Sequence, residues 1–85
     1  MTIINVLLCI YILNNLIDSD RFYIGFTTNI KRRLKEHNDG LSKHTSKFRP
    51  WEVKTVITFN NKKKALKFEK YLKSHSGRAF AKKHF

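Results

Sequence analysis

The sequence predicts a small domain of the α/β (α+β) class, in which three strands and two longer helices share one core. Three segments have the hydrophobic patterns of strands, and two segments repeat apolar residues at helical spacing. The chain has 85 residues, of which 41% are hydrophobic, and this is enough for one modest core. We therefore expect residues 1–85 to form a single domain.

The three strand-like segments differ in how much of their surface is apolar. Val6–Leu13 is aliphatic on both faces, which is typical of a central strand. Arg21–Phe26 and Trp51–Phe59 alternate between apolar and other residues, as strands with one buried face do. The polar segment Asn14–Asp20 predicts a turn. We therefore expect the first two strands to pair as a hairpin.

The first helical segment, Asn29–Asn38, places an arginine and a histidine beside its apolar stripe. Positions i, i+3, i+4 and i+7 of a helix share one face, and here they are Ile30, Arg33, Leu34 and His37. The other basic residues of the segment point elsewhere.

The second helical segment is Lys62–Lys73, where Ala65 and Leu72 belong to the apolar stripe. Ser74–Gly77 is predicted to end this helix, and Arg78–Phe85 to add a short last helix.

The charge balance is strongly basic, with 18 Lys and Arg against six Asp and Glu and a net charge of +12. Such a bias predicts a polyanionic partner, nucleic acid first and an anionic membrane second. Leu41–Pro50 is predicted to be a basic surface loop. The cations that we expect to bind nucleic acid are Lys31, Arg32, Lys35, Lys43, Lys47, Arg49 and Lys73.

The apolar segment Ile3–Ile17 does not predict a signal peptide or a membrane span. It has no basic start, it is interrupted by Asn5, Asn14 and Asn15, and it is shorter than the roughly 20 residues that a spanning helix needs. A buried strand explains it better, so no membrane partner is expected.

The cysteine and histidine usage argues against disulfides and structural zinc. Cys9 is the only cysteine, so it has no internal partner, and we expect a buried small hydrophobe in a reducing cytoplasm. The four histidines lack cysteine partners and the spacing of a zinc site. A cytoplasmic location is therefore predicted.

Four side chains from the hairpin and the first helix suit the cleavage of a phosphodiester. Tyr11 and Tyr23 are expected on one side of the hairpin, and Arg33 and His37 on one helix face. A guanidinium offers a planar fork to the negative charge that grows on phosphorus. A tyrosine with a pKa lowered by neighbouring cations, or His37, could take the proton of an attacking water. Taken singly, each residue is more often packing or solvated surface.

Glu69 is the single acid within residues 61–85 and borders the buried stripe of its helix. One interpretation is an ion pair with Lys73, four residues later. The other is a ligand of a divalent metal ion, completed by waters and phosphate oxygens in a cationic groove.

These pieces, taken in chain order, resemble the GIY-YIG nucleases, especially their small single-domain members. The resemblance covers most of the chain, and its specificity comes from several motifs at suitable spacing. The matching segments are Ile10-Tyr11, Tyr23-Ile24-Gly25, Asn29–Asn38, Pro50-Trp51-Glu52 and Ala65–Lys73.

The resemblance implies a three-stranded antiparallel sheet flanked by helices, with the active site on one face. It also implies hydrolysis of DNA strands with Mg²⁺ or Mn²⁺, one divalent ion per site, in DNA repair or recombination. Tyr11 and Tyr23 inherit the base and positioning roles, Arg33 stabilises the transition state, and Glu69 holds the metal. His37 occupies the place of the family's histidine or tyrosine.

The sequence also departs from the family pattern. Cys9 replaces the first glycine of the first motif, and Phe26 stands where some relatives carry a lysine or serine that would help to lower a tyrosine pKa. A basic nucleic-acid-binding module without catalysis and an RNA-directed nuclease remain alternatives. Oligomeric state, substrate structure and the choice of general base among Tyr11, Tyr23 and His37 stay open.

Overall fold

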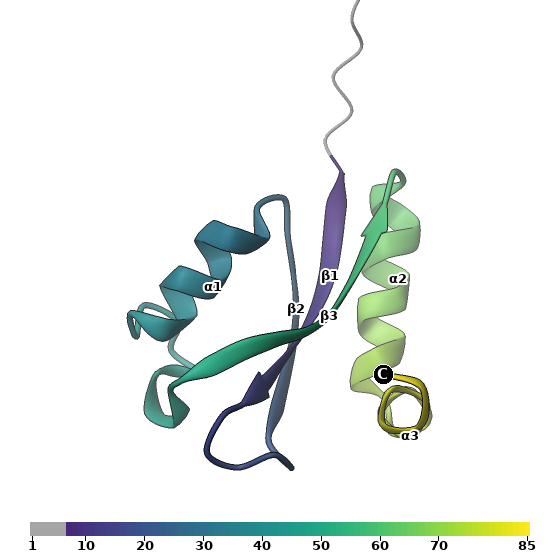
Figure 1. The fold of residues 1–85 in the computed structure, drawn as a ribbon. Helices are drawn as coiled ribbons and strands as arrows, with labels where there is room; N and C mark the ends of the chain where they lie inside the picture. The colour runs from purple at the N-terminus through teal and green to yellow at the C-terminus, as the bar shows by residue number, and fades with distance from the viewer. Residues whose placement is uncertain (1–6) are drawn as a thin grey trace, which may run out of the picture.

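The structure, a computed structural model, describes residues 7–85 and places helices on both sides of a small sheet (Figure 1). Val6, where the first strand was expected to begin, lies outside the described residues. A 3₁₀ turn at Ser46–Phe48 interrupts the basic loop. Within residues 7–85 the strands and helices are β1 (Leu8–Asn15), β2 (Phe22–Thr27), α1 (Ile30–Asn38), β3 (Trp51–Phe59), α2 (Lys62–Lys73) and α3 (His75–His84).

The sheet is antiparallel with the order β2-β1-β3, so the strand that is apolar on both faces is central, as predicted. Tyr11 of β1 lies opposite Gly25, and Leu13 lies opposite Tyr23. Tyr11 and Tyr23 therefore point to the same face, because alternate residues of a strand share a side. The predicted fold class and hairpin are confirmed.

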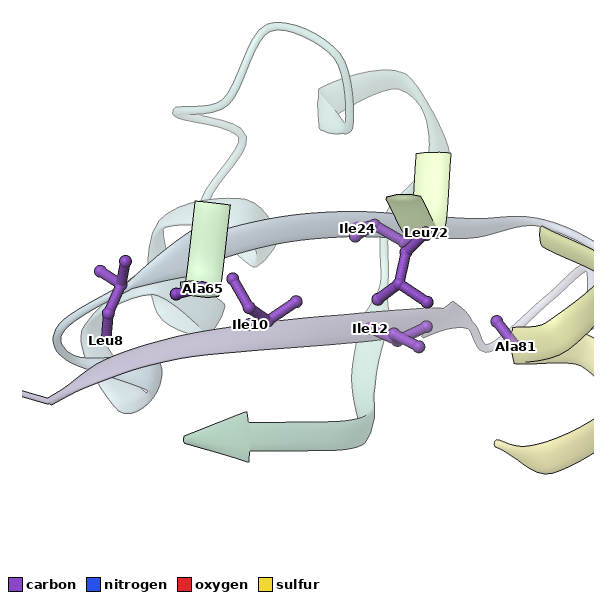
Figure 2. Close-up of a cluster of buried hydrophobic side chains, with 7 residues drawn as sticks. All are labelled: Leu8, Ile10, Ile12, Ile24, Ala65, Leu72 and Ala81. Atoms are coloured by element: carbon purple, nitrogen blue, oxygen red, sulfur yellow. The ribbon is translucent and has the colours of Figure 1, made fainter. Parts of the chain in front are cut away.

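Each face of β1 supplies a different part of the core. Leu8, Ile10 and Ile12 pack with α2 and α3, and Figure 2 shows Leu72 and Ala81 on this side. The odd-numbered residues of β1 face α1, where a second cluster contains Tyr11, Leu13 and Trp51, with Tyr23, Ile30, Leu34 and Val53 around it. A strand buried on both faces needs this continuous apolar run.

A bulge in β3 allows the alternating apolar residues of this strand to pack into both clusters. Ile12 pairs with Thr55 while the next residue, Leu13, pairs with Val53, so Lys54 is the extra residue. An extra residue shifts the alternation to the other face. Trp51 and Val53 thus pack toward α1, whereas Phe59 packs toward α2. The alternation predicted the strand but not this change of face.

Asparagines cap the N-termini of α1 and α2. The side chain of Asn29 accepts a hydrogen bond from the backbone N–H of Arg32 at 3.1 Å, and Asn61 accepts one from Lys64 at 3.0 Å. These caps satisfy N–H groups that have no partner within the helix.

The predicted end of α2 at Ser74 is confirmed, but the break is one residue long, because α3 begins at His75 and not at Arg78. Ser74 ends α2 and caps α3, accepting a hydrogen bond from the N–H of Gly77 at 3.1 Å. A Cβ on Gly77 would lie 1.7 Å from the carbonyl oxygen of Tyr71. This glycine therefore allows α3 to pack closely against the end of α2 instead of ending a helix.

Some side chains predicted to be buried are exposed at the surface. Ile24 is buried, but Phe22 and Phe26 on the same face of β2 are exposed, because α2 and α3 cover only part of this edge strand. Cys9 is half-buried. No helix within residues 7–85 has the length and apolar character needed to cross a membrane.

Candidate active site

A buried hydrogen bond between Tyr11 and His37 forms the centre of the candidate site. Tyr11 points from the middle of β1 toward α1, and His37 points inward from the last turn of α1. The Tyr11 hydroxyl lies 2.9 Å from Nε2 of His37. The other ring nitrogen of His37, Nδ1, lies 2.6 Å from the hydroxyl of Thr45. Tyr11, His37 and Thr45 are almost completely shielded from solvent.

Tyr23 completes an aromatic group around this hydrogen bond. Its ring centroid lies 5.0 Å from that of His37 and 6.3 Å from that of Tyr11. Gly25 of β2 leaves the space that the Tyr11 hydroxyl occupies, because a Cβ there would lie 2.5 Å from that oxygen. A residue larger than glycine would displace the phenol.

Arg33 lies one turn before His37 and is held by Glu36. Its Nη1 is 3.1 Å from Oε1 of Glu36, and the Arg33 side chain remains 30% exposed. A half-buried guanidinium with a fixed orientation can bind an anion that approaches from solvent. Glu36 is a site residue that was not predicted, although its i,i+3 spacing from Arg33 indicates such a pair.

The phenol of Tyr11 is protonated at neutral pH. Burial is the largest cause that raises its pKa, and electrostatic interactions with Tyr23 and with the negative charge of Glu69 add to this effect. A hydrogen bond from Arg33 and the positive charge of that residue oppose the shift without overcoming it. The predicted lowering of a tyrosine pKa by neighbouring cations is therefore wrong for Tyr11 in the free protein, since desolvation is the larger effect.

The imidazole of His37 is neutral under the same conditions. Its pKa is lowered from 6.5 to about 4, mainly by burial and also by the positive charge of Arg33, while Glu36 acts in the opposite direction. Both members of the central hydrogen bond are thus uncharged. A neutral imidazole has one nitrogen free to accept a proton.

Glu69 lies on α2, and its side chain is only 14% exposed. Its carboxylate is 3.3 Å from Nζ of Lys73, so the predicted ion pair is present. The negative charge of Glu69 is the smallest of the causes that raise the pKa of Tyr11. The ion pair and a role as metal ligand are compatible, because a divalent cation can replace the ammonium group of Lys73.

The donor set around Glu69 fits a magnesium ion that is held partly by its substrate. Within the described residues, no three His, Cys, Asp or Glu side chains gather into a preformed metal site. Mg²⁺ commonly binds through one or two carboxylates together with waters and phosphate oxygens. A single shielded carboxylate among lysines suits this mode and does not suit a zinc site with four protein ligands.

The seven cations predicted to bind nucleic acid are all exposed, but several have protein partners. Lys35 pairs with Asp39 at 2.5 Å, and Lys73 pairs with Glu69. Arg49 donates to the carbonyl oxygens of Ser46 and Asn38, which ties part of its guanidinium to the protein. Those predicted cations are Lys31, Arg32, Lys35, Lys43, Lys47, Arg49 and Lys73.

A hollow of about 560 Å³ lies beside Tyr23, between β2 and the junction of α2 and α3. Arg21, Lys73 and Arg78 line it together with two aspartates and Phe22. The sequence analysis missed Arg21 and Arg78, since they come from segments that meet only in the folded chain. This hollow extends the basic surface next to the candidate site.

The family model of the GIY-YIG catalytic domain matches residues 7–83. The chain therefore belongs to the GIY-YIG family, and its antiparallel sheet with helices on both faces is the fold of that domain.

Curated proteins similar to this chain include three structure-specific endonuclease subunits. The SLX1 homolog of Drosophila mojavensis is 48% identical over 52 residues, which are 55% of this chain and 17% of that protein. SLX1 of Podospora anserina is 41% identical over 69 residues, which are 74% of this chain and 20% of that protein. SLX1 of Debaryomyces hansenii is 42% identical over 67 residues, which are 71% of this chain and 19% of that protein. This chain thus spans about a fifth of the length of these relatives.

Proposed function

We propose that residues 1–85 form a single nuclease domain that hydrolyses phosphodiester bonds in DNA with a divalent ion, Mg²⁺ or Mn²⁺. The family match and the names of the relatives support this proposal. The observation that carries it is the buried hydrogen bond between Tyr11 and His37, with Arg33 beside it. Because the relatives are named structure-specific endonuclease subunits, we further propose that the shape of the DNA selects the site of cleavage.

The two neutral groups form a path for the proton of an attacking water. Water gives a proton to the oxygen of Tyr11 while Tyr11 passes its own proton to Nε2 of His37, so no free phenolate accumulates. The water oxygen forms a bond to phosphorus, and the bond from phosphorus to the leaving sugar oxygen breaks. Solvent protonates the leaving oxygen, and His37 later returns its proton to solvent.

Arg33 acts on the phosphate and, through it, on His37. Its guanidinium binds the phosphate oxygens and stabilises the charge that grows on them in the transition state. The free guanidinium also lowers the pKa of His37. A bound phosphate offsets this positive charge, so His37 becomes a stronger base when the substrate is present.

Glu69 is the residue that would hold the metal ion. When bound, the ion would polarise the phosphate and stabilise the leaving oxygen. Lys73 would then be free to contact a neighbouring phosphate, in the hollow that it shares with Arg78. The remaining exposed cations would bind the DNA backbone with little reading of base sequence.

A pair of adjacent arginines gives a matched test of the proposal. Arg33 and Arg32 carry the same charge and both approach Glu36, but the Arg32 side chain is 65% exposed and points away from Tyr11. We expect Arg33→Ala to reduce cleavage of labelled DNA by about 100-fold or more, and Arg32→Ala by only a fewfold.

Cleavage should be measured with Mg²⁺, with Mn²⁺ and with a chelator, on single-stranded, duplex, flap and branched DNA. Equal losses in the two variants would mean that only bulk charge matters. No cleavage of any DNA by the parent chain with either metal would reject the proposed activity.

Two alternatives are separated by the same assays. The ion pair between Glu69 and Lys73 favours a nucleic-acid-binding module without catalysis, which would bind DNA and never cleave it. An RNA-directed nuclease would share the chemistry, and a parallel RNA substrate distinguishes it.

The cytoplasmic location stays a prediction that rests on the free thiol of Cys9.

A further inference from the structure

Thr45 connects the central hydrogen bond to the basic loop that follows α1. Its hydroxyl lies 2.6 Å from Nδ1 of His37, and only 1% of the residue is exposed. The indole N–H of Trp51 donates to the backbone carbonyl of Thr45 at 3.1 Å. Trp51 itself is held, since its backbone N–H donates to the side chain of Asn38 at 2.7 Å. Thr45 is therefore held in place by Trp51 and Asn38, which take no part in the proposed proton transfer.

The direction of the hydrogen bonds follows from what each group can donate. A neutral imidazole has one N–H and one bare nitrogen, while a hydroxyl can donate and accept. The positively charged guanidinium of Arg33 acts on the Tyr11 hydroxyl and can only donate, so the hydroxyl proton is directed away from it and needs another acceptor. Nε2 of His37, at 2.9 Å, is that acceptor. The ring proton must then be on Nδ1 and point to the oxygen of Thr45.

We propose that Thr45 is a positioning residue that holds His37 as the Nδ1–H tautomer, so that Nε2 can accept the proton of Tyr11. The consequence for catalysis rests on the proposed nuclease function, but the tautomer does not. Without an acceptor at Nδ1, the imidazole is free to place its proton on Nε2. Nε2–H would then donate to Tyr11, and the proton path would be blocked.

The inference also gives the basic loop a second role. Lys43 and Lys47 flank Thr45 on either side and are exposed. A loop that contacts phosphates with these lysines therefore also carries the group that orients His37, the acceptor of the Tyr11 proton.

The test compares two variants of Thr45 with a control in the same turn. Thr45→Val keeps the shape of the side chain and removes the hydroxyl, whereas Thr45→Ser keeps the hydroxyl. Ser42→Ala removes a neighbouring buried hydroxyl. This hydroxyl does not orient His37, because the two ring nitrogens of His37 are hydrogen-bonded to Tyr11 and Thr45. The tautomer of His37 is read from the ¹⁵N chemical shifts of its ring at neutral pH.

We expect the parent chain, Thr45→Ser and Ser42→Ala to show the Nδ1–H tautomer, and Thr45→Val to show a mixture or the Nε2–H form. Single-turnover cleavage by Thr45→Val should fall about 10- to 100-fold with KM within about twofold, and serine should restore most of the rate. An Nε2–H tautomer in the parent chain would overturn the proposal even if Thr45→Val does not fold. An unchanged tautomer in folded Thr45→Val would overturn it as well. A confirmed tautomer in a chain that cleaves nothing would reject the proposed function and keep this inference.

Discussion

The space over Gly25 provides a sharp test of the active-site geometry, through Gly25→Ala. The added Cβ would lie 2.5 Å from the Tyr11 oxygen and 2.7 Å from its Cζ atom, whereas ordinary contacts begin near 3.4 Å. The phenol must therefore withdraw by about 1 Å. Such a movement breaks the 2.9 Å hydrogen bond to His37.

We expect Gly25→Ala to slow single-turnover cleavage by about 100-fold, because a misplacement of about 1 Å has effects of this size. The free energy of unfolding should fall by about 1–3 kcal/mol through overpacking. DNA affinity should change by less than about threefold, since no cation is touched.

Gly40→Ala is the matched control. Gly40 has φ of +79°, so alanine there is strained by about 1–2 kcal/mol, but the change lies at the end of α1 and outside the Tyr11 site. It should lower stability to a similar degree with nearly normal cleavage at saturating protein, because the added Cβ would meet only the end of the flexible Arg49 side chain, at 2.9 Å. A folded Gly25→Ala variant with the parent rate would refute the assigned position of the Tyr11 hydroxyl.

Three further predictions concern pH, salt and the core. His37 has a folded pKa of about 4 against 6.5 when unfolded, so the unfolded state binds more protons in this range and stability is lost as the pH falls. The free energy of unfolding by urea should drop by about 2 kcal/mol between pH 7 and pH 5, and a flat profile would contradict the neutral buried imidazole. If about five phosphates are contacted, log K for DNA should fall with log salt at a slope of about −4 to −5, and a slope near zero would reject electrostatic binding. Leu72→Ala should cost about 2–5 kcal/mol of stability, because Leu72 is fully buried on the face of α2 that packs against the sheet, and a loss below about 1 kcal/mol would argue against this packing.

Local patterns in the sequence predicted most of the fold. Asn29 and Asn61 are good helix caps, and the apolar spacing placed Arg33 and His37 on one face. Pairing of the first two strands placed Tyr11 and Tyr23 on one side. These features depend on nearby residues, so periodicity and capping preferences were sufficient.

The remaining features depend on contacts between distant segments. The sequence gives no signal that Thr45, in a loop, reaches His37, because that contact requires the loop to fold back over α1. The bulge at Lys54 depends on how β3 meets β1, and the role of Gly77 depends on how closely α3 packs against the end of α2. The raised pKa of Tyr11 arises from burial, whose extent only the folded structure shows.

The central claim, that Glu69 holds a catalytic metal ion, is tested most directly by the Mg²⁺ dependence of cleavage in Glu69→Gln. The substitution keeps the size and helix propensity of the side chain but removes the charge that attracts the ion. Glu52→Gln makes the same chemical change at an exposed position of β3 and serves as the control. The account predicts that Glu69→Gln stays folded, binds DNA at least as tightly as the parent, and cleaves it slower by orders of magnitude, with partial recovery at high Mg²⁺. A folded Glu69→Gln variant that cleaves DNA at the rate of Glu52→Gln, with the same dependence on Mg²⁺, would contradict the account and leave the ion pair with Lys73 as the role of Glu69.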